Sequence, residues 1–192
     1  CCGVPLIANG FVDKARKQAR VNARSLEEAI VERQLPVIAT SSTCTFTLRD
    51  EYPHVLDVDT TPLRDSIELA TRFLWRRLEE GATLNLKHTP LRVAYHTPCH
   101  MEKMGWAIYT LELLKRIPGV EVLVLDSRCC GIAGTYGFKS ENYPTSQAIG
   151  EPLFKQIEAS GVDMVITDCE TCKWQIEMST SKRCEHPITL LA

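Results

Sequence analysis

Apolar residues recur at every third or fourth position in two parts of the first half of the chain. The first stripe predicts an amphipathic helix and consists of Ala15, Ala19, Ala23, Leu26 and Ile30. Within it, Ser25 and Glu28 have the form of a capping box and allow the helix to restart there. A second stripe predicts a helix over residues 62–80 that stops at Gly81.

Short β-branched or apolar runs alternate with these helices. Residues 35–40 predict a buried strand, and residues 91–95, 121–125 and 164–167 predict three more. Further strand candidates lie at 54–58 and 188–191. In the second half, residues 104–114 and 140–160 show helical periodicity, the latter interrupted at Gly150 and Pro152, while residues 4–10 and 81–90 resemble loops.

The chain contains one pattern twice. An offset of 128 positions places Cys1-Cys2-Gly3 on Cys129-Cys130-Gly131 and Thr43-Cys44 on Thr171-Cys172, and it places Ser41 on Cys169. With the alternation of strands and helices, this predicts an α/β fold of two tandem repeats, residues 1–85 and 86–192. Each is expected to be a small, mainly parallel sheet flanked by helices, with cysteines at the C-terminal edges of the strands.

Composition and charge exclude two classes of function. The 192 residues are 44% hydrophobic and 24% charged, with a net charge of -2, so no basic excess favours nucleic acid. No apolar run approaches the roughly 20 residues of a membrane helix. Any membrane contact is therefore expected to be peripheral or through a partner.

One helix face is strongly basic. Five cations without an intervening acid occupy it: Lys14, Arg16, Lys17, Arg20 and Arg24. This face suits an acidic partner or an anionic membrane surface, and the simpler interpretation is a solvated helix face.

The chain opens on a cysteine that already belongs to a motif. A mature lipoprotein would begin with a lipidated cysteine, but Cys1 aligns with the internal Cys129. The counterpart of Cys99 would precede residue 1. We therefore expect this sequence to be a fragment.

Five cysteines of the second half form a candidate metal site: Cys99, Cys129, Cys130, Cys169 and Cys172. A structural zinc site usually has two CxxC-like knuckles and four ligands, which five thiols with one knuckle fit poorly. Iron–sulfur clusters are held by cysteine thiolates, and an adjacent pair can bridge two irons. We favour a cluster; a thiol-disulfide couple at the CxxC would leave three thiols unexplained.

Other residues near these cysteines have candidate supporting roles. His96 and His100 flank Cys99, and we expect structural or supporting roles for them rather than ligation. Asp168 is expected to hydrogen-bond near the site or to cap the following turn, and Cys184 has no counterpart in the pattern. The glycines at 131, 134 and 137 would let backbone N–H groups approach sulfur, but they lack the spacing of a dinucleotide fingerprint, so no flavin or NAD site is expected.

The motif His96-Thr97-Pro98-Cys99-His100, followed by Cys-Cys-Gly and then Cys-x-x-Cys, resembles the cysteine-rich, or CCG, domain family. That family includes the B subunit of heterodisulfide reductase and the iron–sulfur subunits of glycolate oxidase, of lactate oxidation systems and of anaerobic glycerol-3-phosphate dehydrogenase. The chain is most similar to the C-terminal part of the last type. The N-terminal part of that type, which would carry two ferredoxin-type 4Fe-4S motifs, is absent from this sequence.

The resemblance implies a non-catalytic electron-transfer subunit. It would relay electrons from a flavin-containing dehydrogenase partner, in anaerobic glycerol-3-phosphate oxidation, toward membrane quinone. The resemblance further implies a protein that would be cytoplasmic and peripheral on the inner face of the cell membrane. The alternatives are a catalytic disulfide reductase of the heterodisulfide reductase type and a zinc-stabilised interaction module.

The resemblance also implies ligands. In the second copy they fall on the five cysteines named above, and in heterodisulfide reductase such a set holds a noncubane 4Fe-4S cluster. In the first copy they fall on Cys1, Cys2 and Cys44, with Ser41 where a cysteine is expected. That copy is expected to bind a cluster, zinc or nothing.

Overall fold

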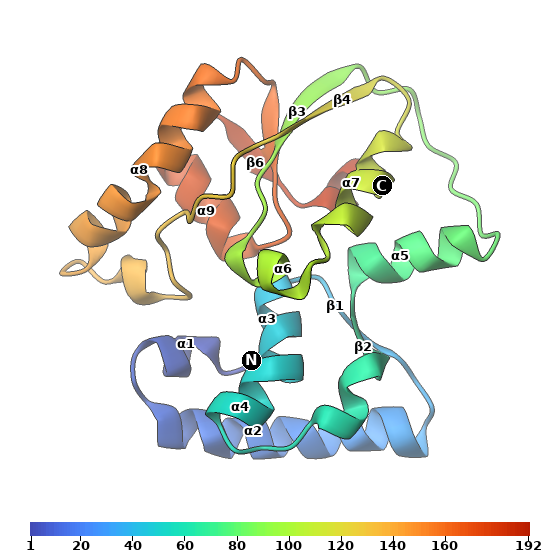
Figure 1. The fold of residues 1–192 in the computed structure, drawn as a ribbon, viewed down its shortest axis with the longest axis vertical. Coiled ribbons are helices and arrows are strands. Elements are labelled where there is room, and N and C mark those ends of the chain that lie inside the picture. Colours follow the sequence, from blue (N-terminus) through green and yellow to red (C-terminus); the bar gives the residue numbers. More distant parts are fainter.

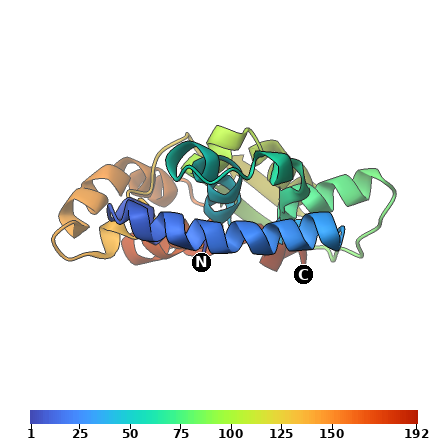
Figure 2. The same ribbon diagram turned by 90° about the horizontal axis from the view of Figure 1, so that it is seen from below.

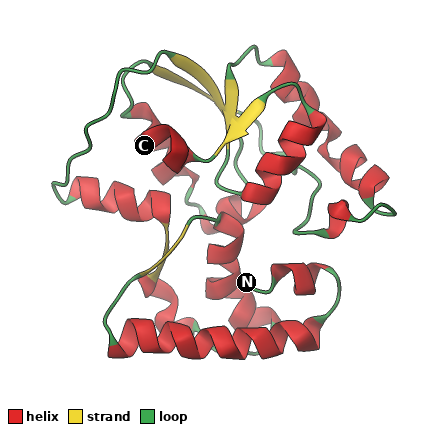
Figure 3. Cartoon of the chain, turned by 180° about the vertical axis from the view of Figure 1, so that it is seen from behind, coloured by secondary structure: helices red, strands yellow, loops and turns green.

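The computed structural model describes all residues, 1–192, and contains two all-parallel sheets (Figures 1 and 3). The smaller sheet pairs β1 (Val37–Ala39) with β2 (Ile67–Leu69). The larger sheet has the order β4-β3-β5-β6 and consists of β3 (Leu91–Tyr95), β4 (Val120–Val124), β5 (Met164–Ile166) and β6 (Arg183–Glu185). The predicted α/β class with two parallel sheets is confirmed.

Helices precede, follow and connect these strands. Those before β3 are α1 (Val4–Ala8), α2 (Val12–Glu27), α3 (Ser42–Phe46), α4 (Tyr52–Val55) and α5 (Ala70–Glu79). Those after β3 are α6 (Cys99–Met104), α7 (Ala107–Lys115), α8 (Tyr143–Ala159), α9 (Glu170–Ser179) and α10 (Pro187–Leu191). The helix α3 runs from the small sheet toward the lower helices and meets α6 below the large sheet (Figure 1).

The core lies on both faces of β3, because alternate strand residues point to opposite faces. One apolar cluster includes Val93, Tyr95 and Leu114, on the side of the sheet that α7 covers. Another includes Ala94 and Ile157 on the side that α8 and α9 cover (Figure 1). Each fully buried large apolar side chain contributes about 1.5–3 kcal/mol. The strands that carry the cysteines therefore have a rigid support.

The helix α2 lies along the outside of the first half of the chain (Figure 2). Its small residues Ala15 and Ala19 are fully buried against Tyr52 and Leu56. The Tyr52 hydroxyl donates to the backbone oxygen of Cys2 over 2.9 Å. The helical stripe therefore positions the first Cys-Cys pair.

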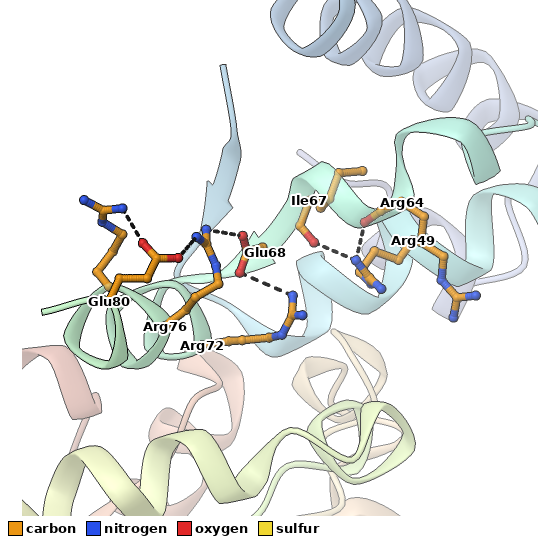
Figure 4. Close-up of polar contacts among 8 residues, drawn as sticks. Arg49, Arg64, Ile67, Glu68, Arg72, Arg76 and Glu80 are labelled. Carbon is orange, nitrogen blue, oxygen red and sulfur yellow. Dashed lines mark hydrogen bonds and ion pairs between the residues drawn. The ribbon is translucent and has the colours of Figure 1, made fainter. Parts of the chain in front are cut away.

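An ion network attaches β2 to the neighbouring helices (Figure 4). Glu68 is buried and accepts hydrogen bonds from Arg72 at 3.3 Å and Arg76 at 2.8 Å. Arg49 donates to the backbone oxygen of Ile67 over 2.8 Å and to that of Arg64. Removing Glu68 would leave two cations without their shared carboxylate, so this network fixes the short second strand in place.

Three segments expected to be loop or strand are partly or wholly helical, and each of these helices has proline in its first turn. They are residues 4–10, where α1 contains Pro5, residues 54–58, where α4 contains Pro53, and residues 188–191, where α10 begins at Pro187. Proline has no N–H to leave unpaired in a first turn, and its fixed φ suits a helix start. Proline indicated a helix start at these positions rather than a break.

The predicted helix over residues 62–80 is also wrong in its first half. A 3₁₀ turn (Thr61–Ser66) and β2 precede α5. Pairing with β1 and burial of all three β2 residues override the helical periodicity. Strand β6 was likewise not foreseen, since its central Cys184 lies between charged residues.

Three finer expectations are corrected as well. The first helix continues through Ser25 into a π-helical turn at Glu28–Glu32 and does not restart. The helix α8 continues through Pro152 because the neighbouring Leu153 and Phe154 are buried in the core. Strand β1 is not buried, since Ile38 is 43% exposed.

Candidate metal centre

The ends of three parallel strands bring the five cysteines of the second half around one cavity. Cys99 begins α6 after β3, Cys129 and Cys130 follow β4, and Cys169 precedes α9 after β5. All five line a cavity of about 60 Å³. The expected gathering at the C-terminal edge of the sheet is therefore observed.

The sulfur atoms are close to one another and to hydrogen-bond donors. Cys130 Sγ lies 3.3 Å from Cys172 Sγ, and Cys129 Sγ accepts a hydrogen bond of 3.3 Å from the backbone N–H of Gly131. None of the nine cysteines of the chain forms a disulfide. No group of three His, Cys, Asp or Glu side chains converges as in a site for a single metal ion.

Mutual hydrogen bonds divide the sulfurs into thiols and thiolates. The bond with Cys172 lowers the pKa of Cys169 to about 6, with smaller contributions from hydroxyl groups. Hydrogen bonds with Cys130 and Cys99 lower the pKa of Cys129. Hydrogen bonds with Cys130 and Cys169 raise the pKa of Cys172. Thiolate is the form that ligates metal, and five cysteines are more than a single tetrahedral ion takes, so this donor set suits an iron–sulfur cluster.

The Cys-Cys-Gly turn depends on its glycine. Gly131 has φ +87°, and a Cβ there would lie 2.0 Å from the backbone oxygen of Ser146. The Ser146 hydroxyl donates to the Gly131 oxygen over 2.9 Å and accepts from Gln175 over 2.9 Å. Helices α8 and α9 therefore hold this turn against the sheet.

The two histidines near Cys99 have different surroundings. His96 is buried, with Nδ1 3.1 Å from Thr167 Oγ1 and Nε2 3.1 Å from the Arg128 oxygen. Burial lowers its pKa to about 4, so it is neutral and has a structural role. His100 instead lines the cavity and stacks on Phe46, with ring centroids 5.0 Å apart.

Asp168 points into the protein interior, away from the expected roles near the sulfurs or as a cap. Its carboxylate accepts hydrogen bonds from Tyr95 at 2.7 Å, Thr110 at 3.0 Å and Thr71 at 3.2 Å. Burial raises its pKa. It therefore joins β3, α7 and α5. Cys184, the thiol without a counterpart, is fully buried in the core.

The first half of the chain repeats the geometry in reduced form. Cys2 Sγ lies 3.2 Å from Cys44 Sγ, and this hydrogen bond lowers the pKa of Cys44 to about 7. Cys1 is exposed, and together with Ser41 these cysteines line a cavity of about 320 Å³. Ser41 precedes α3 just as Cys169 precedes α9. The serine therefore occupies the backbone position of the absent thiol.

The two cavities adjoin each other. Thr43, Gly134 and Thr171 line both of them. The backbone N–H of Ser42 donates to the backbone carbonyl oxygen of Asp168 over 2.9 Å, and this bond connects the starts of α3 and α9. In the sequence, Thr43 and Thr171 served only as markers of the repeat. Their shared offset of 128 was the signal that could have identified them as residues that line the two cavities.

The basic face of α2 is exposed at Lys14, Lys17, Arg20 and Arg24. Arg16 departs from this pattern, because it pairs with Asp13 at 2.9 Å and with Asp57 at 3.2 Å. No helix of the structure has the length and apolarity needed to cross a bilayer.

Comparison with known proteins agrees with this arrangement. Residues 1–49 and 93–177 match the model of a family described as "Cysteine-rich domain", CCG. The chain belongs to the cysteine-rich (CCG) domain family. The two matched segments contain both Cys-Cys-Gly motifs and the Cys-x-x-Cys.

Several relatives are similar over most of the chain. The C subunit of anaerobic glycerol-3-phosphate dehydrogenase from Escherichia coli (strain K12) is 77% identical over 192 residues, which cover 100% of this chain and 48% of the relative. The B subunit of fumarate reductase (CoM/CoB) from Methanothermobacter marburgensis is 29% identical over 191 residues, 95% and 35% of the two chains. Lactate utilization protein A of Geobacillus thermodenitrificans is 31% identical over 182 residues, which cover 88% of this chain and 71% of the relative. The chain thus spans about half the length of the first of these relatives.

Proposed function

We propose that Cys99, Cys129, Cys130, Cys169 and Cys172 hold an iron–sulfur cluster. The observation that carries this proposal is that all five line one cavity at the ends of three parallel strands. A tetrahedral zinc ion takes four ligands, whereas a cluster of several irons uses more thiolates. When bound, the cluster would supply one-electron transfer. We propose a 4Fe-4S cluster, of either the cubane or the noncubane type.

The chain would then be an electron-transfer part of a larger oxidoreductase, without a catalytic residue of its own. The similarity to the C subunit of anaerobic glycerol-3-phosphate dehydrogenase supports flavin-containing dehydrogenase subunits as the electron donor. Electrons would pass toward membrane quinone. The protein would work in the cytoplasm, at the inner face of the cell membrane.

The two repeats would divide the work, with residues 1–85 and 86–192 as the two modules. The first retains Cys1, Cys2 and Cys44, and its sulfur pair has the same spacing as its counterpart. With Ser41 in place of a thiol, its metal would be held weakly, as zinc or as a labile cluster.

A second candidate function is disulfide reduction at the cluster, favoured by the resemblance of the five-cysteine set, all of which lines one cavity, to that of heterodisulfide reductase. In that case a small disulfide would reoxidise the reduced protein directly. An electron relay instead predicts that the reduced protein is reoxidised by a quinone analogue when the partner subunits are present, and not by the disulfide.

The test is anaerobic purification followed by iron, zinc and sulfide analysis, EPR of oxidised and reduced forms, and reoxidation by each acceptor. The proposal predicts iron with acid-labile sulfide, an EPR signal that changes on reduction, and no faster reoxidation with disulfide. Zinc without a chromophore would leave a structural module and contradict the relay. Fast reoxidation by disulfide would favour the reductase.

A further inference from the structure

Thr43 belongs to the first repeat but reaches the sulfur cavity of the second. Its hydroxyl oxygen lies 3.4 Å from Cys169 Sγ and 3.1 Å from His100 Nδ1. Its counterpart in the repeat, Thr171, lies 3.3 Å from the same sulfur. Two equivalent threonines, one from each repeat, therefore approach Cys169.

The His100 ring is held by contacts with the first repeat. It stacks on Phe46 with an interplanar angle of 19°, and its Nδ1 points to Thr43. The other nitrogen, Nε2, lies 4.0 Å from Glu51 Oε1, which is too far for a hydrogen bond. Thr43 is thus the hydrogen-bond partner of this imidazole.

The number of protons fixes the direction of these bonds. A hydroxyl group has one hydrogen, and a metal-bound cysteine is a thiolate without any. If Cys169 ligates metal, Thr43 must donate to its sulfur to make that hydrogen bond. The Thr43 oxygen can then only accept from His100, so Nδ1 must carry a hydrogen whether the ring is neutral or charged.

We propose that Thr43 is a positioning residue that links His100 to Cys169 across the two repeats and makes the metal group at this site easier to reduce. This inference rests on the cluster proposed above. Hydrogen bonds to ligating sulfurs are among the factors that set the potential of a cluster. Reduction adds negative charge, which a hydroxyl donor at the sulfur stabilises.

Three variants separate this role from a structural one. Thr43→Val keeps the shape and removes the hydroxyl, whereas Thr43→Ser keeps the hydroxyl. Thr45→Val is the matched control, because Thr45 is buried on the same helix and donates only to the Ser41 oxygen, at 2.9 Å. Iron content and thermal midpoint are measured for every protein.

The first readout is the reduction potential, determined by a redox titration that EPR monitors. We expect Thr43→Val to shift it to more negative values by about 59 mV, equal to a tenfold change in a one-electron equilibrium constant. Thr43→Ser and Thr45→Val should retain the wild-type value. An unchanged potential in Thr43→Val, or an equal shift in Thr45→Val, overturns the inference.

The second readout needs no cluster. In metal-free reduced protein, ¹⁵N NMR of the imidazole should show the Nδ1–H tautomer of His100 in wild type and Thr43→Ser, because Nδ1 faces the Thr43 oxygen. Thr43→Val should shift it toward Nε2–H, facing Glu51. A wild-type Nε2–H tautomer contradicts the link. If wild type holds no iron, the proposed function and the redox role of Thr43 both fail, and the tautomer alone decides whether the link exists.

Discussion

Cys2 and Cys44 hold their sulfurs 3.2 Å apart, and the residues 128 positions later, Cys130 and Cys172, hold theirs at 3.3 Å. Each pair joins a Cys-Cys-Gly turn to the first turn of a helix. The repeat in sequence is therefore also a repeat in geometry. Among the positions that the offset matches, the two sets differ at Ser41, which stands where Cys169 stands in the other.

Ser41→Cys is expected to repair the first site. The backbone is extended both at Ser41, with φ -99° and ψ 125°, and at Cys169, with φ -146° and ψ 115°, so a thiol at position 41 would face the first-repeat cavity that Ser41 lines. We predict that zinc binds to this site at least about tenfold more tightly, or about 1.4 kcal/mol. Competition with a chromophoric chelator measures the change. Ser140→Cys, which adds an exposed thiol outside the cavity, should leave the affinity unchanged, and an equal gain in both variants would refute the repair.

The two Cys-Cys-Gly glycines provide a matched pair for stability. Gly3 and Gly131 both have positive φ, at +100° and +87°, but only at Gly131 would a Cβ collide with another part of the chain. Gly3→Ala should cost about 1–2 kcal/mol through the backbone alone. Gly131→Ala should cost about 3 kcal/mol or more, because the collision with Ser146 adds to that cost. Urea unfolding gives both values, and equal losses would show that the collision is relieved without cost.

Stability should fall in mild acid because of His96. Burial lowers its pKa to about 4, against about 6.5 in the unfolded chain, so the folded state favours the neutral ring. Its contribution is therefore fully present above pH 6.5 and is lost as the pH falls toward 4, by up to about 3 kcal/mol. Chemical unfolding of wild type and His96→Gln between pH 4 and 7.5 measures it. The variant should show a flatter pH dependence, and parallel curves would be inconsistent with a buried neutral His96.

Much of the sulfur site followed from the sequence because it depends on chain order and strand direction. Cysteines placed after successive strands of a parallel sheet must gather at one edge, whatever the details of packing. The offset of 128 similarly identified Ser41 as the position of an absent thiol. Both deductions use local pattern and topology, which a single sequence contains.

The elements that were wrong depend on contacts between distant residues. Strand β2 lies within a helical pattern and forms because β1 pairs with it. Pro152 stays inside α8 because buried residues lie both before it, at Gly150, and after it, at Leu153. The link from His100 through Thr43 to Cys169 crosses between the repeats, and periodicity within one element carries no information about such a contact.

The most direct test of the cluster is the iron and sulfide content of Cys172→Ser and of its counterpart Cys44→Ser, after identical anaerobic reconstitution. Cys184→Ser, which removes a buried thiol that does not line the cavity, is the control. We predict about four irons per chain in wild type, Cys44→Ser and Cys184→Ser, and loss of most iron and sulfide in Cys172→Ser. Full iron in Cys172→Ser, or its loss in Cys44→Ser alone, would contradict a cluster held by the five thiols of the second repeat.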